Sequence, residues 1–424
     1  MKVFKFGGAS VKNAGAVKNV VEILKRYPDQ QIMVVVSAMG KTTNALEELT
    51  RLYHERNKGW KEVLENIRCF HFEIVAGLFQ DTSLVNQELG AWFDALEKLL
   101  EKRPSKNYDY EYGRIVPFGE LFSTCIVNCY LNENQIPSRW FDARKVIRTN
   151  ASYRDGKVDW KLTESMIKEE VLPHFQDTAN EKIGLTQGFI SSTTKNRTTT
   201  LGREGSDYTA ALFAYFLNAE EVIIWKDVPG LLNADPKYFP EARKLDSISY
   251  RDAIELAYYG ASIIHPKTIK PLQNKEIPLR IKSFIAPGDE GSVICGNIQS
   301  ETRIPCYLFK TNQLLISISP KDFSFIAEEN LYAIFGIFAR YHVKINLMQN
   351  SAISFSVCTD NDPKNVQAVI KSLQRKFNVR YNQNLELITI RNYNQETIAK
   401  VVRGRKIILE QKSRLTAQII VSVE

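Results

Sequence analysis

The chain has 424 residues, 44% of them hydrophobic and 25% charged, with a formal net charge of +8. These values are ordinary for a soluble protein of two or three domains with a large core. They argue against a nucleic-acid binder, because the best basic cluster, Val401 to Lys406, is short and lacks interleaved aromatic residues. The mild charge fits an anionic substrate, but it equally fits no specific role.

No membrane span or signal peptide is visible in the sequence, so we expect a cytoplasmic protein without a membrane partner. Its six cysteines are scattered and form no CxxC pair, which argues against a zinc ribbon or a thioredoxin-type site. Cys125 and Cys129 share a helical face, and we interpret them as small buried hydrophobic residues. The thiols are expected to be reduced.

Strands and helices alternate along the first half of the chain. A short strand, Lys2 to Phe6, is followed by Gly7 and Gly8, and apolar residues then recur at helical spacing through residues 14–27. A longer helical block fills Ala45 to Lys102. An apolar run typical of a buried parallel strand lies at residues 32–37, and two more strands are predicted at residues 183–190 and 220–228. This order predicts an α/β fold with a mostly parallel sheet covered on both faces.

After about Gly296 the elements become shorter. Residues 314–390 read as strand, helix, strand, strand, helix, strand, which is a ferredoxin-like α+β unit. A second copy begins at residue 394 and stops before its closing helix and strand. Because an incomplete unit would leave an open sheet edge, we expect it to borrow a strand upstream, at Ile304 to Lys310.

The stretch "MVVVSAMGKTTN" contains Gly40, Lys41 and Thr42 in the order that ends a P-loop. A P-loop needs a second glycine five positions earlier, where this chain has Val35. Any phosphate must therefore be bound by another architecture.

Several polar groups follow the predicted strands, where open α/β sheets bind ligands. Gly7 and Gly8 allow backbone N–H groups to approach an anion that the ammonium of Lys5 could also reach, although a glycine pair is equally a tight turn. Ser37 and Thr43 follow the second strand, where Thr42 or Thr43 could equally be a helix N-cap.

Two later stretches carry more charge. Glu120 opens an apolar helix, where a capping role is the ordinary interpretation. Arg203, Ser206 and Asp207 cluster at the start of another helix, which Ser206 is predicted to cap, and Asp207 could hold a metal–nucleotide complex. Asp227 follows the next strand and could equally be a turn residue.

Taken together, these stretches resemble the aspartate kinases of the amino-acid kinase family. Seven motifs occur in the family's order along the chain: "KFGGASV", "VVVSAMGKTTN", "FGE", "TQGFI", "TLGREGSDYTAA", "WKDVPGLLNADP" and "YGASIIHPKT". The resemblance implies a carbamate-kinase-like αβα sandwich at residues 1–295. It also implies a monofunctional enzyme that uses ATP and Mg²⁺ to phosphorylate the side-chain carboxylate of L-aspartate, the first step toward lysine, threonine and methionine.

The resemblance also implies roles for individual residues. Lys5, Gly8 and Asp207 would be catalytic, and Asp207 would organise Mg-ATP, with no metal ligand assigned directly. Aspartate would be held by Ser37, Thr43, Glu120, Arg203 and Ser206, in which Glu120 suits the ammonium group and Arg203 a carboxylate. The nucleotide would be bound by Lys5, Gly7, Gly8, Ser10, Lys226, Asp227, Leu232, Lys237 and Ser262.

Three positions depart from the family pattern. Ala9 removes a hydroxyl from the glycine loop, Glu204 adds a negative charge beside the phosphate region, and Ser262 replaces a lysine. Lys5, Glu120 and Asp207 all remain, so an active enzyme is expected.

The C-terminal part resembles paired ACT regulatory domains. The expected boundaries are a linker and donated strand at residues 296–312, a first ACT domain at 313–384 and a shortened second one at 385–424. The resemblance implies a homodimer formed through these domains and an amino-acid effector, lysine or threonine. Lysine-sensitive relatives commonly carry Glu where this chain has Ala352, so threonine or no effector stays open beside lysine.

Two alternatives stay open at this stage. One is another amino-acid kinase, for example one acting on glutamate, and the other is an amino-acid sensor with a degenerate kinase core. Product formation with aspartate would separate the first from the expected enzyme, and ATP binding without turnover would indicate the second.

Overall fold

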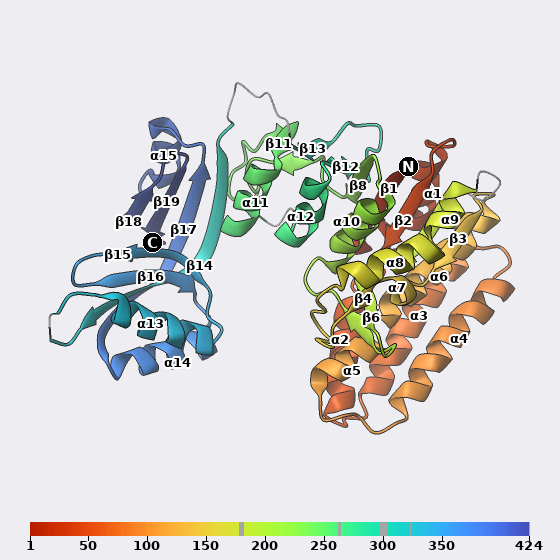
Figure 1. Cartoon of the computed structure of the whole chain (residues 1–424), viewed down its shortest axis with the longest axis horizontal. Coiled ribbons are helices and arrows are strands. Elements are labelled where there is room, and N and C mark those ends of the chain that lie inside the picture. The colour runs from red at the N-terminus through yellow and green to blue at the C-terminus, as the bar shows by residue number, and fades with distance from the viewer. Residues whose placement is uncertain (178–181, 262–263, 297–303, 323, 424) are drawn as a thin grey trace. The chain divides into compact units, whose positions relative to one another are not determined.

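The computed structural model describes residues 1–177, 182–261, 264–296, 304–322 and 324–423 (Figure 1). The chain divides into two compact units. The first comprises residues 1–231, 244–254 and 262–298, and the second comprises residues 232–243, 255–261 and 299–424. Each unit contains a sheet of its own.

An eight-stranded sheet forms the centre of the first unit, in the order β11-β13-β12-β8-β1-β2-β5-β3. β12 and β13 are antiparallel, and every other pair of neighbours is parallel. β2 is buried along its whole length, as its apolar run predicts. The mostly parallel sheet is therefore confirmed. Its strands are β1 (Lys2–Phe6), β2 (Ile32–Val36), β3 (Ser138–Phe141), β5 (Ile183–Gln187), β8 (Glu221–Lys226), β11 (Ser247–Ser249), β12 (Leu279–Ser283) and β13 (Ser292–Cys295).

Helices surround this sheet and extend beyond it on one side, where α2, α3 and α4 run alongside one another (Figure 1). The predicted helical block at Ala45 to Lys102 is thus three helices. It is interrupted where Asn57 accepts a hydrogen bond from the backbone of Gly59 and where Asp81 accepts one from Ser83. The helices are α1 (Ala14–Lys25), α2 (Thr42–His54), α3 (Trp60–Leu78), α4 (Ser83–Leu100), α5 (Tyr108–Ile115), α6 (Phe118–Glu133), α7 (Ala143–Val146), α8 (Trp160–Glu170), α9 (Leu172–Gln176), α10 (Gly205–Leu217), α11 (Tyr250–Tyr259) and α12 (Pro266–Asn274).

Short elements fill the remaining turns. The glycine pair after β1 leads into a 3₁₀ turn, η1 (Gly8–Val11), before α1 begins. A three-stranded sheet contains β4 (Arg148–Thr149), β6 (Ile190–Thr193) and β7 (Thr198–Thr200), and a two-stranded one contains β9 (Leu231–Leu232) and β10 (Lys244–Leu245).

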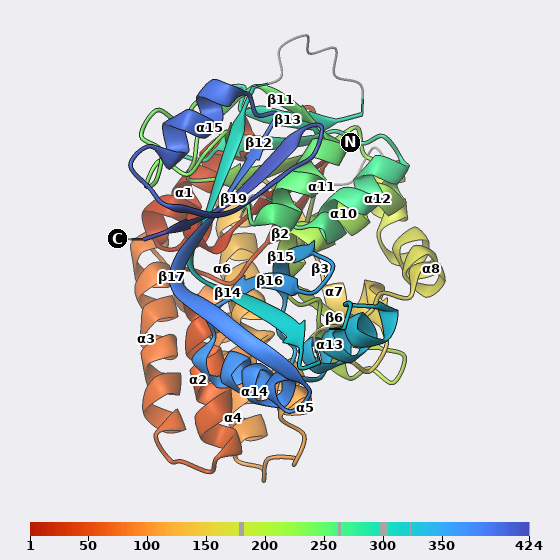
Figure 2. The same cartoon turned by 90° about the vertical axis from the view of Figure 1, so that its left-hand side faces the viewer.

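The second unit contains a six-stranded antiparallel sheet in the order β15-β16-β14-β17-β19-β18. Its two longest strands, β14 and β17, lie side by side through the sheet (Figure 2). The elements are β14 (Cys306–Pro320), α13 (Glu328–Arg340), β15 (Ile345–Asn350), β16 (Phe355–Asp360), α14 (Pro363–Gln374), β17 (Phe377–Arg391), α15 (Gln395–Val402), β18 (Ile407–Lys412) and β19 (Thr416–Ser422).

The upstream segment does supply a strand to the second half of this sheet, because Cys306–Lys310 pairs with Leu387–Arg391. The sequence indicated separate strands at residues 304–310 and 314–319, and that was wrong. They form one continuous strand with register shifts around Gln313. α13 and α14 pack on one half of the sheet and α15 on the other, and alternate strand residues form a third core on the opposite face.

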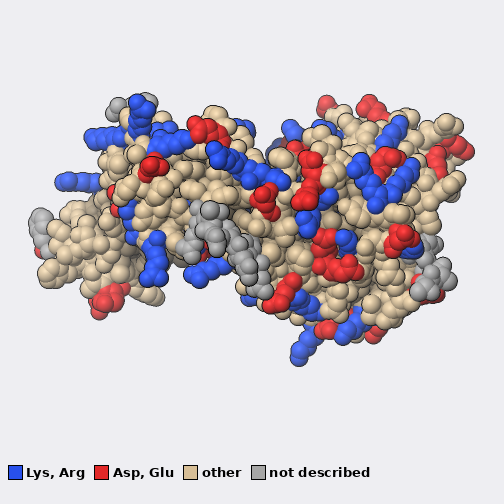
Figure 3. All heavy atoms as spheres, turned by 90° about the horizontal axis from the view of Figure 1, so that it is seen from above, with Lys and Arg blue, Asp and Glu red and all other residues tan. Residues whose placement is uncertain are grey.

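Among the described residues, no helix combines the length and the apolar character that crossing a membrane would require. On the face shown in Figure 3, acidic and basic side chains are interspersed over the first unit. The net positive charge is therefore not gathered there into one basic surface.

Candidate active site

A pocket of about 870 Å³ lies in the first unit at the carboxyl ends of the central strands. β1 contributes Lys5 and β8 contributes Lys226, while Ser37 directly follows β2. Helices α2, α6 and α10 bring further side chains to the same pocket. This is the edge at which open α/β sheets bind ligands. Of the predicted site residues, the lining includes Lys5, Ser37, Thr43, Glu120, Arg203, Ser206, Asp207 and Lys226.

An ion pair between Lys5 and Asp207 lies at the centre of the site. The Lys5 Nζ is 2.7 Å from the Asp207 Oδ1, and the two side chains are only 10% and 4% exposed. Asp207 lies in the first turn of α10, where the helix dipole favours a negative charge. The pair therefore places a fixed cation and a fixed carboxylate together in a nearly dry environment, where electrostatic interactions are strong.

Gly8 is required by the packing of two loops. A Cβ atom at Gly8 would lie 2.8 Å from the Ala38 carbonyl oxygen and 2.9 Å from that of Gly40. The Gly40 N–H also donates to the Gly8 carbonyl at 3.0 Å. The "SAMGKTTN" loop thus packs against the glycine pair.

Glu120 is a second buried carboxylate in the pocket, and it lies in the first turn of α6. It is 2% exposed, and its Oε1 accepts a hydrogen bond of 3.3 Å from the Ala38 N–H. Its Oε2 is buried without a hydrogen-bond partner among the described residues. Burial raises the pKa of Glu120 to about 8. An unpartnered buried carboxylate of this kind is suited to receive a cationic group from a ligand.

The start of α10 corrects one prediction. The helix begins at Gly205 and not after a Ser206 cap, and the preceding Glu204 has a φ of 54°. This is the left-handed region, which favours glycine. Glu204, one of the three positions that depart from the family pattern, is therefore a strained residue in the pocket wall. The Glu204 Oε2 is buried and has no hydrogen-bond partner in the part of the chain that the structure describes.

One wall of the pocket was missed by the sequence analysis. The Tyr112 hydroxyl donates to the Glu47 Oε1 at 2.7 Å, and the Arg154 guanidinium lies over the Tyr112 ring. Burial, followed by the bond to Glu47, raises the pKa of Tyr112. Glu47 could have been found, because it lies four residues after Thr43 on the same face of α2.

Three more lining residues come from the loop that carries Asp155 and from the start of α12, where His265 is the N-cap and Lys267 lies in the first turn. The Lys267 Nζ lies 2.6 Å from the Asp155 Oδ1, and His265 lines the pocket beside them. Burial lowers the pKa of His265, an effect that the nearby Glu204 opposes. His265 and Lys267 belong to the "YGASIIHPKT" motif, so the sequence contained a signal for them.

The remaining predicted nucleotide residues do not line this pocket. The Ser10 hydroxyl is buried and donates to the Trp225 carbonyl at 3.3 Å. Leu232 and Lys237 belong to the second unit, and Ser262 lies outside the described residues. Gly7, Gly8 and Asp227 belong to the first unit without lining the pocket.

The chain is similar to known proteins along most of its length. Residues 1–283 match the amino acid kinase family. Lysine-sensitive aspartokinase 3 of Escherichia coli (strain K12) is 31% identical over 399 residues, which cover 92% of this chain and 86% of that protein.

Solved structures agree with this similarity. The E. coli aspartokinase III complex with lysine and aspartate (T-state) has a TM-score of 0.84 and 28% identity, and covers 100% of this chain and 96% of that one. The complex with aspartate and ADP (R-state) has a TM-score of 0.82 at the same identity and coverage. With a family match over residues 1–283 and a related enzyme matched over most of its length, the chain belongs to the amino acid kinase family and, within it, to the aspartokinases.

Proposed function

We propose that this pocket transfers the γ-phosphoryl group of ATP to the side-chain carboxylate of L-aspartate. The proposal is carried by one observation: a buried Lys5–Asp207 ion pair lines the same pocket as Glu120, whose buried Oε2 has no partner among the described residues. A carboxylate oxygen of aspartate forms the new bond to phosphorus, the bond from phosphorus to the β,γ-bridging oxygen breaks, and ADP leaves. The product is 4-phospho-L-aspartate.

The reaction needs no strong general base, because the attacking carboxylate is already ionised at neutral pH, with a reference pKa of about 3.9. Catalysis can therefore depend on alignment and charge neutralisation. Lys5 has the charge and position to stabilise the transferring group, and Asp207 orients the Lys5 ammonium.

For aspartate, Glu120 is the proposed partner of the ammonium group and Arg203 that of the α-carboxylate. Arg203 is exposed and lines the pocket, so its guanidinium is available for a bidentate contact. Ser37, Thr43 and Ser206 supply hydroxyl groups around the same space.

Magnesium fits the chemistry of this pocket. Asp207 and Glu204 place carboxylate oxygens in its wall, and oxygen ligands are those that Mg²⁺ prefers. Asp207 would hold the ion. When bound with ATP, Mg²⁺ neutralises charge on the phosphates. The predicted contacts of Gly7, Gly8, Ser10, Lys226, Asp227, Leu232, Lys237 and Ser262 with the nucleotide remain part of this proposal.

The second unit is proposed to be a pair of ACT domains, at residues 313–384 and 385–424, that binds an amino-acid effector and forms a homodimer. The donated strand at Cys306–Lys310 supports this arrangement. Lysine is the first effector to test, because the related E. coli enzyme was solved with lysine, and threonine is the second. The cytoplasm is the proposed location of the reaction.

The test is ATP-dependent formation of an acyl phosphate, trapped by hydroxylamine, with L-aspartate and separately with L-glutamate. Product with aspartate alone supports the proposal, and product with glutamate alone contradicts it. ATP binding without any product would favour the degenerate sensor. Repeating the assay with lysine or threonine tests the effector, and light scattering after size-exclusion chromatography tests the dimer.

A further inference from the structure

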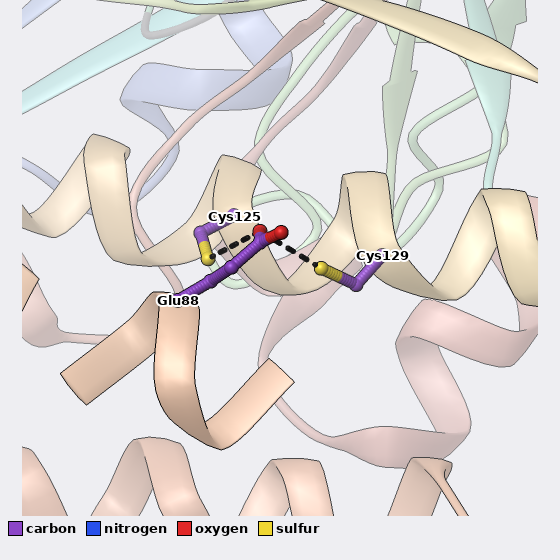
Figure 4. Close-up of side chains that lie close together, drawn as sticks. All are labelled: Glu88, Cys125 and Cys129. Atoms are coloured by element: carbon purple, nitrogen blue, oxygen red, sulfur yellow. Dashed lines mark hydrogen bonds between the residues drawn. The ribbon is translucent and has the colours of Figure 1, made fainter. Parts of the chain in front are cut away.

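Three potential metal ligands meet between α4 and α6, in a part of the first unit that the kinase reaction does not use. Cys125 and Cys129 lie on consecutive turns of α6, and Glu88 reaches toward both from α4 (Figure 4). The Glu88 Oε2 is 3.3 Å from the Cys129 Sγ and 3.9 Å from the Cys125 Sγ. The three ligand atoms all lie within 4.8 Å of one another.

This separation is close to what a bound metal ion requires. Zinc forms bonds of about 2.3 Å to sulfur and about 2.0–2.2 Å to carboxylate oxygen, so two thiolates on a tetrahedral ion lie about 3.8 Å apart. Small rotations of side chains would bring these atoms to that distance. The helical spacing of four residues also lets two ligands on consecutive turns bind one ion, as paired histidines do in HExxH sites.

We propose that Glu88, Cys125 and Cys129 form a binding site for zinc or a similar thiophilic divalent cation. The two sulfur ligands select such an ion over magnesium or calcium, which prefer oxygen. Three protein ligands leave a fourth position for water. Cys125 is buried, while Cys129 is partly exposed and Glu88 is exposed, so the ion can enter from solvent.

Binding would join two helices, one of which leads to the active site. α6 also carries Glu120 and Thr124, and the Thr124 hydroxyl accepts hydrogen bonds from Gln187 at 3.0 Å and Trp140 at 3.1 Å. An ion between α4 and α6 would therefore stabilise the helix that positions Glu120. The site itself does not depend on the proposed kinase reaction, and its test measures metal directly.

The experiment uses the full reduced chain with Co²⁺ as the probe, because cobalt bound to thiolate gives a charge-transfer band that cobalt bound to oxygen alone does not. We expect one equivalent of Co²⁺ with this band, displaced by Zn²⁺. C129S and E88Q should each weaken Co²⁺ binding at least about 10-fold. Removing a residue that only hydrogen-bonds to a metal ligand already costs about 10-fold in affinity, and these two residues would be ligands themselves.

C69S is the matched control. Cys69 is an exposed cysteine on α3 whose Sγ lies 3.5 Å from the Glu65 Oε1, one helical turn away, so it has the same thiol–carboxylate contact without a second thiol. Cobalt binding should be unchanged in C69S. Because C129S and E88Q alter exposed or partly exposed side chains, both variants should fold even if C125S does not.

Two results would overturn the proposal. One is the absence of the charge-transfer band in the wild-type chain at equimolar Co²⁺. The other is equal binding by wild type, C129S and E88Q, which would leave the cluster as two thiols hydrogen-bonded to a carboxylate.

Discussion

The pockets of the two units differ in whether a buried carboxyl group has a partner within the protein. In the first unit, Glu120 is buried with an oxygen that has no partner among the described residues. In the second, a pocket of about 680 Å³ is lined by Glu386, which is also buried but bonds to Arg405 within the same unit. Because an unpartnered buried charge is costly, the pKa of about 8 leaves Glu120 mostly protonated in the free protein at neutral pH, and a cationic ligand would supply the partner that its ionised form lacks. The difference indicates that the pocket of the first unit is suited to bind a charged ligand, whereas the buried charge in the pocket of the second unit is already paired within the protein.

The largest effect is expected from K5M. Activity should fall by about 10²–10³-fold, the loss seen when a group that stabilises transition-state charge is removed. The buried Asp207 would also lose its partner, which destabilises a protein by about 3–5 kcal/mol. Steady-state kinetics and denaturant unfolding measure the two effects.

The double variant K5M/D207N separates these effects. It should recover most of the stability without recovering activity. Recovery of activity would show that Lys5 acts through folding alone.

E120Q should raise the KM for aspartate about 10- to 100-fold, because a hydrogen bond to a charged group contributes about 1.5–3 kcal/mol. The KM for ATP should change little. An unchanged KM for aspartate in E120Q would show that Glu120 does not bind the substrate. The difference between Glu120 and Glu386 would then have no functional meaning.

The same carboxyl predicts a dependence of stability on pH. Its pKa in the folded protein is raised to about 8 from an ordinary value of 4.5, so the folded state holds the proton more tightly than the unfolded state. Its contribution to the free energy of unfolding is therefore most favourable below pH 4.5 and falls as pH rises toward 8. The difference in unfolding free energy between wild type and E120Q, measured at pH 5 and pH 8, should shift in favour of E120Q at pH 8.

E204G is expected to stabilise the fold by about 1 kcal/mol, because glycine adopts the left-handed conformation without strain. Removing this charge should also lower the KM for ATP severalfold if Glu204 repels the phosphates. Gln135 has a similar φ of 59° and is exposed outside the pocket, so Q135G should give the stability gain alone. A higher KM for ATP in E204G would instead support a role for Glu204 in holding magnesium.

The smallest effect is expected in the second unit. R405A removes the partner of Glu386, but because the Arg405 side chain is 41% exposed the loss should be about 1 kcal/mol. R403A, at an exposed arginine two positions earlier, should cost less. Basal kinase activity should be unchanged in both, and a large loss in R405A would mean that the second unit contributes to catalysis.

The sequence was sufficient to predict the residues whose position depends on strand order. Lys5 lies near the end of a strand that any parallel arrangement brings to the ligand-binding edge, and Glu120 and Asp207 lie in first turns of helices that begin there. The conformation of Glu204 could not be predicted, because most non-glycine residues avoid a positive φ. The wall formed by Tyr112 and Arg154 depends on tertiary contacts of α5 with α2 and with a loop distant in sequence.

In the second unit, the periodicity of apolar residues predicts the helices and strands, but it does not predict that two of the strands are continuous. Residues 304–310 and 314–319 have separate apolar patterns because each half of the strand faces a different core. The register shifts around Gln313 change which side chains face inward, and periodicity alone interprets such a change as a break.

The shared strands also determine when this unit can fold. Cys306 lies opposite Arg391, and β17 in turn pairs with β19 near residue 420. As the ribosome makes the chain, the segment from Cys306 to Lys310 must stay unpaired until its partner strand has emerged. Contacts so distant in sequence form slowly, and exposed strand edges aggregate in the meantime. During synthesis, the Cys306–Lys310 end of β14 is therefore exposed to aggregation until Leu387–Arg391 has emerged.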